Sequence, residues 1–79
     1  MSNSTALDVP GEMKNLVQKI EEAIKRRVAI GSRIQYPKLQ QEMSARFDNA
    51  RAIDLAILSM VRRDDFVHHE QRKILERKR

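Results

Sequence analysis

Cysteine is absent from this chain, and glycine, proline and aromatic residues are scarce. Its 79 residues include two glycines, two prolines, one tyrosine and two phenylalanines. Without cysteine there is no disulfide, no thiol nucleophile and no thiolate zinc site. Gly11 and Gly31 lie far apart, so no glycine-rich loop can hold nucleotide phosphates. No apolar run approaches the roughly 18 residues that span a bilayer, so we expect no membrane contact.

The residue groupings that support catalysis are also missing. Ser32 and Ser44 have no evident histidine and aspartate partners, and the acidic residues are scattered as helix-surface charges. A chain of this length builds one domain with one modest core, which leaves little chain for a catalytic pocket. We therefore predict that this chain is not an enzyme and holds no cofactor.

Basic residues exceed acidic ones, and they gather towards the end of the sequence. Lysine and arginine total 16, aspartate and glutamate total 11, and the formal net charge is +5. The last eight residues contain one acid and five bases: Arg72, Lys73, Arg77, Lys78 and Arg79. Such a basic end favours a polyanionic partner, either nucleic acid or an acidic protein surface, although it could also serve solubility alone.

The spacing of apolar residues predicts three helices followed by a β-hairpin. Residues 1–12 have the composition of a flexible linker or leader, and residues 13–79 that of a folded domain. Helices are expected at about 12–27, 37–46 and 50–63. Strands are expected at 66–69 and 73–76, and the extended segment 32–35 can add a third strand.

This order of elements predicts a mainly α fold with a small β-hairpin, the winged helix. The second and third helices are joined by a very short turn, as in a helix-turn-helix. A two-stranded hairpin alone is only marginally stable in water. It must therefore pack on the helices, through Phe66, Ile74 and Leu75.

The third predicted helix carries Arg51, Leu55, Leu58 and Arg62 on the side opposite its apolar stripe. In a DNA-reading helix-turn-helix, this side enters the major groove and offers polar groups to the base edges. Leucine can contact only a thymine methyl or another apolar surface, so we expect no sequence-specific DNA reading. The two leucines are either core residues or a stripe for docking a protein.

Adjacent histidines at the hairpin suggest a metal site, which the strand geometry disfavours. Neighbouring strand residues point to opposite faces, so His68 and His69 would not easily share one ion. No third ligand is evident, and we predict no metal site. We expect one histidine to pack at the hairpin edge and the other to be solvated. In the intervening turn, Arg72 and Lys73 either contact a phosphate backbone or are simply solvated.

Two separated stretches carry unusual motifs: IKRRVAIGS at residues 24–32, and MVRR at 60–63 followed by His68 and QRKIL at 71–75. They resemble the start and the end of the C-terminal domain of subunit five of the minichromosome maintenance (MCM) replicative helicase. The resemblance covers about residues 16–79. The chain departs from the family pattern at Asp64, where glycine is common, at Pro37, and at the pair Leu55 and Leu58.

The resemblance implies a winged-helix module of a eukaryotic, nuclear, hexameric, ATP-dependent DNA helicase, with ATP and magnesium bound outside this chain. The implied partners are other subunits of the hexamer, helicase-loading or activating factors, and DNA bound weakly without sequence preference. We expect a regulatory docking role in helicase loading and activation at replication origins. The residues expected to contact DNA or an acidic partner are Arg26, Arg27, Arg51, Arg62, Arg72, Lys73, Arg77, Lys78 and Arg79. The alternatives are a free-standing winged-helix DNA-binding regulator and a purely structural interaction domain.

Overall fold

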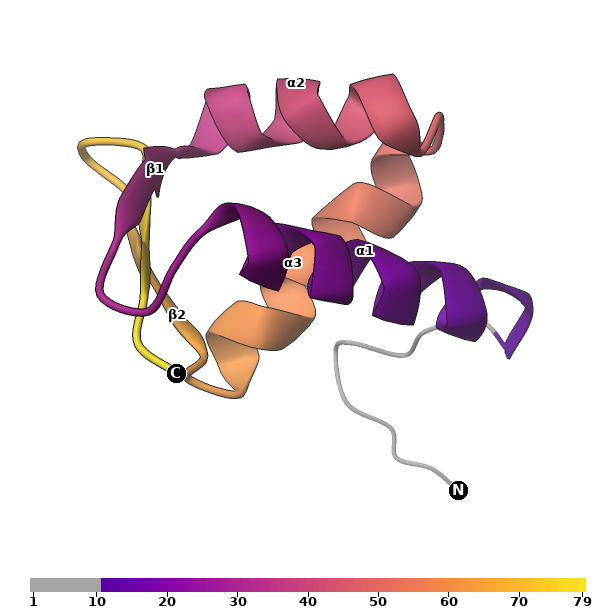
Figure 1. Cartoon of the computed structure of the whole chain (residues 1–79), viewed down its shortest axis with the longest axis horizontal. Helices are drawn as coiled ribbons and strands as arrows, with labels where there is room; N and C mark the ends of the chain where they lie inside the picture. The colour runs from indigo at the N-terminus through magenta and orange to yellow at the C-terminus, as the bar shows by residue number, and fades with distance from the viewer. Residues whose placement is uncertain (1–10) are drawn as a thin grey trace.

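Three helices pack beside a three-stranded antiparallel sheet in the computed structural model, which describes residues 11–79 (Figure 1). The helices are α1 (Lys14–Arg27), which follows a 3-10 turn at Gly11–Met13, α2 (Tyr36–Arg46) and α3 (Ala50–Arg62). The strands are β1 (Arg33–Gln35), β2 (Phe66–His69) and β3 (Ile74–Arg77). This order confirms the predicted winged-helix fold and its third strand. The boundary expected at residue 12 stays a prediction, because residues 1–10 lie outside the described part of the chain.

The residues at the helix ends explain where the helices begin and stop. Pro37 lies in the first turn of α2, where its missing N–H costs no hydrogen bond. The Asn49 side chain accepts a hydrogen bond from the Ala52 backbone N at 3.0 Å and caps α3. After α3, Asp64 has a φ of 63°, a left-handed conformation that aspartate tolerates. These turns bring β2 directly after α3.

The last strand, β3, is the central one, so the sheet order is β1-β3-β2. One cross-strand row contains Ile34, Leu75 and His68, and the next contains Arg33, Glu76 and Val67. Ile34 and Leu75 are buried against the helices. Because side chains alternate along a strand, the second row lies on the outer face of the sheet.

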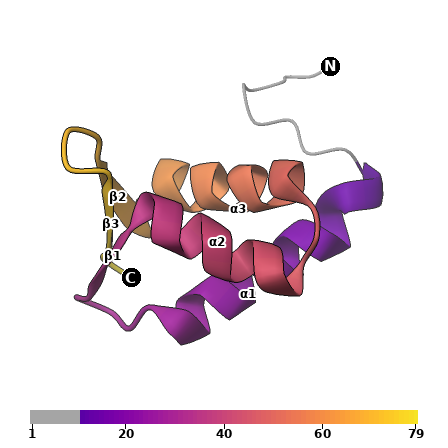
Figure 2. The ribbon, with the colours of Figure 1, turned by 90° about the horizontal axis from the view of Figure 1, so that it is seen from above.

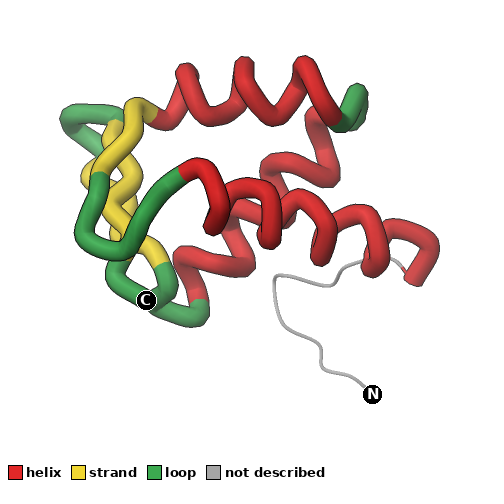
Figure 3. Tube along the Cα trace, in the orientation of Figure 1, coloured by secondary structure: helices red, strands yellow, loops and turns green. Residues whose placement is uncertain are grey.

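The hydrophobic core lies where the helices meet the inner face of the sheet, which closes one end of the helical layer (Figures 2 and 3). Its members come from all the helices and strands: Val17, Ile20, Ala23, Ile24, Val28, Ile34, Leu39, Met43, Ala52, Ile53, Ala56, Ile57, Met60, Phe66 and Leu75. Burying a large apolar side chain contributes roughly 1.5–3 kcal/mol. The core therefore fixes the position of the hairpin relative to α2 and α3.

Candidate interaction surfaces

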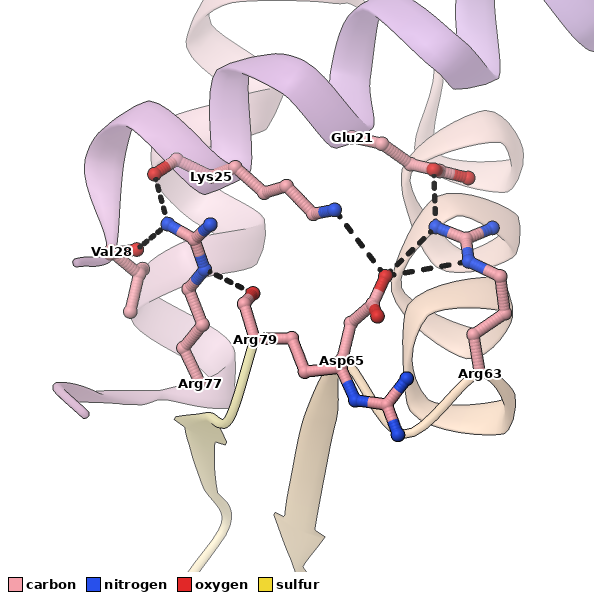
Figure 4. A network of polar contacts seen from close by, with 7 residues as sticks. All are labelled: Glu21, Lys25, Val28, Arg63, Asp65, Arg77 and Arg79. Atoms are coloured by element: carbon pink, nitrogen blue, oxygen red, sulfur yellow. Dashed lines mark hydrogen bonds and ion pairs between the residues drawn. The ribbon is translucent and has the colours of Figure 1, made fainter. Parts of the chain in front are cut away.

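The basic C-terminal segment is held by the fold rather than free (Figure 4). Arg77 lies in β3, and its Nη1 donates hydrogen bonds to the backbone oxygens of Lys25 and Val28, at 2.8 and 2.9 Å. These carbonyls lie at the end of α1, where a helix leaves C=O groups without partners. The expectation that Arg77 contacts DNA or an acidic partner must therefore be corrected, because its guanidinium caps α1.

Asp65 joins α1 and the end of α3 to the same C-terminal segment. Its Oδ2 accepts a hydrogen bond from Arg63 Nη2 at 3.2 Å and lies 3.4 Å from Lys25 Nζ (Figure 4). Arg63 also donates to Glu21 Oε1 at 2.7 Å, and the Asp65 backbone oxygen accepts from the Lys78 backbone N at 2.7 Å. This cluster ties α1, the α3–β2 turn and the segment after β3 together, so it serves the fold rather than a partner.

Acidification should destabilise the domain through its paired carboxylates. Burial would raise the pKa of Asp65, but hydrogen bonds from Arg63 and Lys25 outweigh it, and the pKa lies below its ordinary value. The pKa of Glu76 is lowered, chiefly by its hydrogen bond with His69. A carboxyl with a lowered folded pKa contributes stability above its unfolded pKa, and this is lost as the pH falls through the folded pKa.

We therefore expect the free energy of unfolding to fall progressively as the pH decreases from about 5 to about 3. Thermal unfolding at stepped pH measures this. An Asp65→Asn variant should show a shallower decrease, because it removes one of the titrating groups. A decrease equal to that of the unaltered chain would rule out Asp65 as a contributor.

The outward face of α3 contains one packed leucine and one exposed leucine. Leu55 is half-buried and packs against the core, whereas the Leu58 residue is 44% exposed. Arg51 and Arg62 are exposed, and the ion pairs formed within residues 11–79 involve other bases. Of the two possibilities that the sequence left open, core packing thus applies to Leu55 and surface exposure to Leu58. We call Arg51, Leu55, Leu58 and Arg62 together the α3 stripe.

The other basic residues expected at an interface do not form one surface. Arg26 is exposed at the end of α1, and Arg27 donates to both carboxylate oxygens of Glu42, at 2.6 and 3.1 Å. The exposed pair Arg72 and Lys73 lies in the β2–β3 turn, beside the start of α2, while the segment after β3 lies at the opposite end of the sheet (Figure 1). There, Lys78 pairs with Glu76 at 3.4 Å, and Arg79 is exposed.

Two hollows flank the β2–β3 turn. One, of about 390 Å³, adjoins the outer face of the sheet and is lined by Arg33, His69, Glu70, Gln71, Arg72 and Ile74. The other, of about 380 Å³, lies between the turn and the start of α2 and is lined by Tyr36, Pro37, Gln40, His68, Glu70 and Lys73. Sequence reasoning missed this second hollow. The Tyr-Pro pair signals a helix start, but nothing in the sequence indicates that the hairpin packs beside it.

The two histidines lie on opposite faces of the sheet, in agreement with strand alternation. The His68 ring packs against the Tyr36 ring, with centroids 4.9 Å apart and planes inclined at 45°. The His69 side chain is 41% exposed, as expected of a solvated histidine, and its Nε2 also lies 3.0 Å from Glu76 Oε1. No group of three potential metal ligands was found among residues 11–79.

The two glycines do not form a phosphate-binding loop of the kind that holds ATP. Gly11 and Gly31 lie at opposite ends of α1, one in the 3-10 turn and the other before β1, rather than in one phosphate-binding loop. We assign no step to ATP or magnesium on this domain. Among the same residues, no helix has the length and apolar character needed to cross a membrane.

The family described as "MCM5, C-terminal domain" has a model that matches residues 19–77. A comparison with individual curated proteins gives no match. The matched region includes all of IKRRVAIGS, MVRR and QRKIL. It spans most of α1, all of α2 and α3, and the whole sheet. It confirms the resemblance to the C-terminal domain of this helicase subunit. The chain therefore belongs to the MCM5 C-terminal domain family and is part of a subunit of the MCM helicase.

Proposed function

We propose that this domain is a non-catalytic docking module that regulates helicase loading and activation at replication origins in the nucleus. The observation that carries this is the α3 stripe, in which exposed Leu58 lies between exposed Arg51 and Arg62. Ile30 and Leu58 are the exposed large hydrophobic residues in the described part of the chain. Protein interfaces combine an apolar centre with a polar rim, and arginine is enriched in them.

The chemistry of the stripe indicates the kind of partner that it fits. Leu58 would enter an apolar socket, and the arginines on either side would meet acidic residues around it. Other MCM subunits and the loading or activating factors are the proposed partners. ATP and magnesium would bind elsewhere in the helicase, and this domain would contribute no catalytic group.

Weak DNA contact is a second part of the proposal. Arg72 and Lys73 are exposed at the β2–β3 turn and can reach phosphates, a contact that positions a protein without reading sequence. The leucines of the α3 stripe offer no hydrogen bonds to base edges. This chemistry and the family membership together favour a helicase module over a free-standing DNA-binding regulator.

The proposal is tested by Leu58→Glu in the intact subunit, assembled with the other subunits. We expect the hexamer to form and hydrolyse ATP, but loading onto origin DNA by its loading factors should fall about tenfold or more. Losing a hot-spot residue at the centre of an interface costs about 2 kcal/mol or more of binding free energy, and we expect Leu58 to be such a residue. The fold should persist, because surface substitutions usually change stability by less than about 0.5 kcal/mol.

Ile30→Glu is the matched control, because it introduces the same charge at an exposed apolar residue in the α1–β1 loop, outside the α3 stripe. It should load like the unaltered subunit. Normal loading with Leu58→Glu would refute the docking role of the α3 stripe.

A further inference from the structure

We propose that the hollow between the β2–β3 turn and the start of α2 binds one unpaired base of single-stranded DNA. We call it the Tyr36 hollow, lined by Tyr36, Pro37, Gln40, His68, Glu70 and Lys73. The inference rests on the DNA contact proposed above, and adds to it a site that takes a base rather than a phosphate alone.

The Tyr36 hollow has the size and the surface for a planar ring. Its volume of about 380 Å³ falls within the roughly 300–1,000 Å³ of small-ligand sites. Tyr36 and His68 are among its lining residues, and their rings pack against each other, with centroids 4.9 Å apart. Of the other aromatic residues, Phe66 is buried and Phe47 is half-buried beneath Arg46. Tyr36 thus supplies an aromatic ring at a hollow on the surface.

The backbone that carries Tyr36, His68 and Lys73 is fixed by the fold, so little ordering of the main chain is needed when a ligand binds. The Tyr36 backbone N donates to the Lys73 backbone oxygen at 2.7 Å, which joins the start of α2 to the β2–β3 turn. His68 lies in the cross-strand row of buried Leu75. A backbone that is already in place before binding avoids part of the entropic cost of forming a site.

The charged and polar groups around the hollow suit the parts of a nucleotide. Lys73 has a φ of 53°, is exposed, and takes part in none of the ion pairs within residues 11–79, so its ammonium is available for a phosphate. The Glu70 carboxylate can accept a hydrogen bond from an exocyclic amine of a base. The Tyr36 phenol is neutral at neutral pH, and burial and the nearby Asp54 raise its pKa further above the ordinary value.

Single-stranded DNA fits this combination better than a duplex. In a duplex the bases are stacked on their neighbours, and an aromatic platform cannot reach their faces. Proteins that bind single strands combine basic residues along the backbone with aromatic rings on which bases stack, and every base has such a face. A helicase separates strands and so supplies unpaired bases near its own domains.

The test compares three fluorescently labelled DNAs of equal length, binding to the 79-residue chain at low salt: a normal single strand, a single strand of abasic sites, and a duplex. We expect the normal strand to bind about fivefold or more tightly than the abasic strand, from the contribution of one stacked base. His68→Ala should remove most of this difference. Lys73→Ala should weaken normal and abasic strands by the same factor, because it removes a phosphate contact.

Lys19→Ala is the control, since it removes one exposed charge from α1, outside the Tyr36 hollow. It should change neither the ratio nor the affinity. Circular dichroism melts establish that each variant is folded, and the comparison of normal with abasic strands needs no variant at all.

The possible outcomes separate the two proposals. Equal affinity for normal and abasic strands would overturn the Tyr36 hollow as a base site and leave the phosphate contact intact. An absence of binding to all three DNAs at low salt would overturn both the base site and the DNA contact proposed above. Neither outcome bears on docking by the α3 stripe, which is measured separately through Leu58.

Discussion

Replacing Leu75 by alanine will lower the free energy of unfolding by about 2–5 kcal/mol, the range found for leucine truncation in protein cores. Leu75 is 1% exposed and lies in central strand β3, opposite Ile34 of β1 and His68 of β2. Its loss would leave a cavity between the sheet and the helices. Because small domains are stable by only about 5–15 kcal/mol, this one contact accounts for much of the total.

Urea unfolding followed by circular dichroism measures this change, with Val67→Ala as the control. Val67 belongs to the same sheet but lies in the row on its outer face, and it is only half-buried. We expect Val67→Ala to cost less than about 1.5 kcal/mol. Equal costs for the two substitutions would mean that the hairpin is not held by its inner face.

Arg77→Met will give the second large loss of stability, about 2–3 kcal/mol. The substitution keeps an unbranched apolar side chain but removes the guanidinium that donates to the oxygens of Lys25 and Val28. Hydrogen bonds to charged groups contribute about 1.5–3 kcal/mol each, and the half-buried position reduces their sum because water can reach the freed carbonyls. The end of α1 should become the weakest part of the helix.

Thermal unfolding gives the overall loss, and amide hydrogen exchange shows where it arises. Exchange should accelerate in the last turn of α1 and in the β1–β3 pairing. Arg79→Met is the matched control, because the Arg79 side chain is exposed and only its backbone oxygen accepts from Arg77. If both variants melt at the same temperature, the guanidinium of Arg77 does not stabilise α1.

The helices and the hairpin could be predicted because the signals for them are local. A 3.6-residue apolar period marks each helix, and Pro37, Asn49 and Asp64 act on the turns where they stand. The family resemblance rested on contiguous motifs and could be recognised in the same way. These features require no knowledge of which distant segments touch.

The role of Arg77 could not be predicted, because it depends on contacts across 49 and 52 residues of sequence. The sequence predicts the last strand at 73–76, whereas β3 occupies Ile74–Arg77. With the strand ending one residue earlier, Arg77 is the first residue of a free tail. Inside the strand, it lies beside the end of α1 and loses its freedom to contact a partner.

The exposure of the α3 stripe and the contacts of the hairpin histidines also could not be predicted, because they too depend on distant segments. A helical wheel places Leu55 and Leu58 on one outward side, but α3 packs against α1, α2 and β2, so Leu55 is partly covered. The pairing of His69 with Glu76 and the packing of His68 on Tyr36 follow from strand register and from where the sheet meets α2. Neither is encoded within a single segment.

The sheet order β1-β3-β2 has a consequence for the synthesis of the protein. The central strand is the last element of the domain to be translated, so β1 and β2 leave the ribosome without a partner for either of them. Until residues 74–77 emerge, the sheet cannot form. Ile34 and Phe66 then lack the completed inner face that helps to bury them. A nascent chain that stops before residue 74 therefore loses all three strands at once, and offers a three-helix intermediate with an uncovered apolar end to chaperones and proteases.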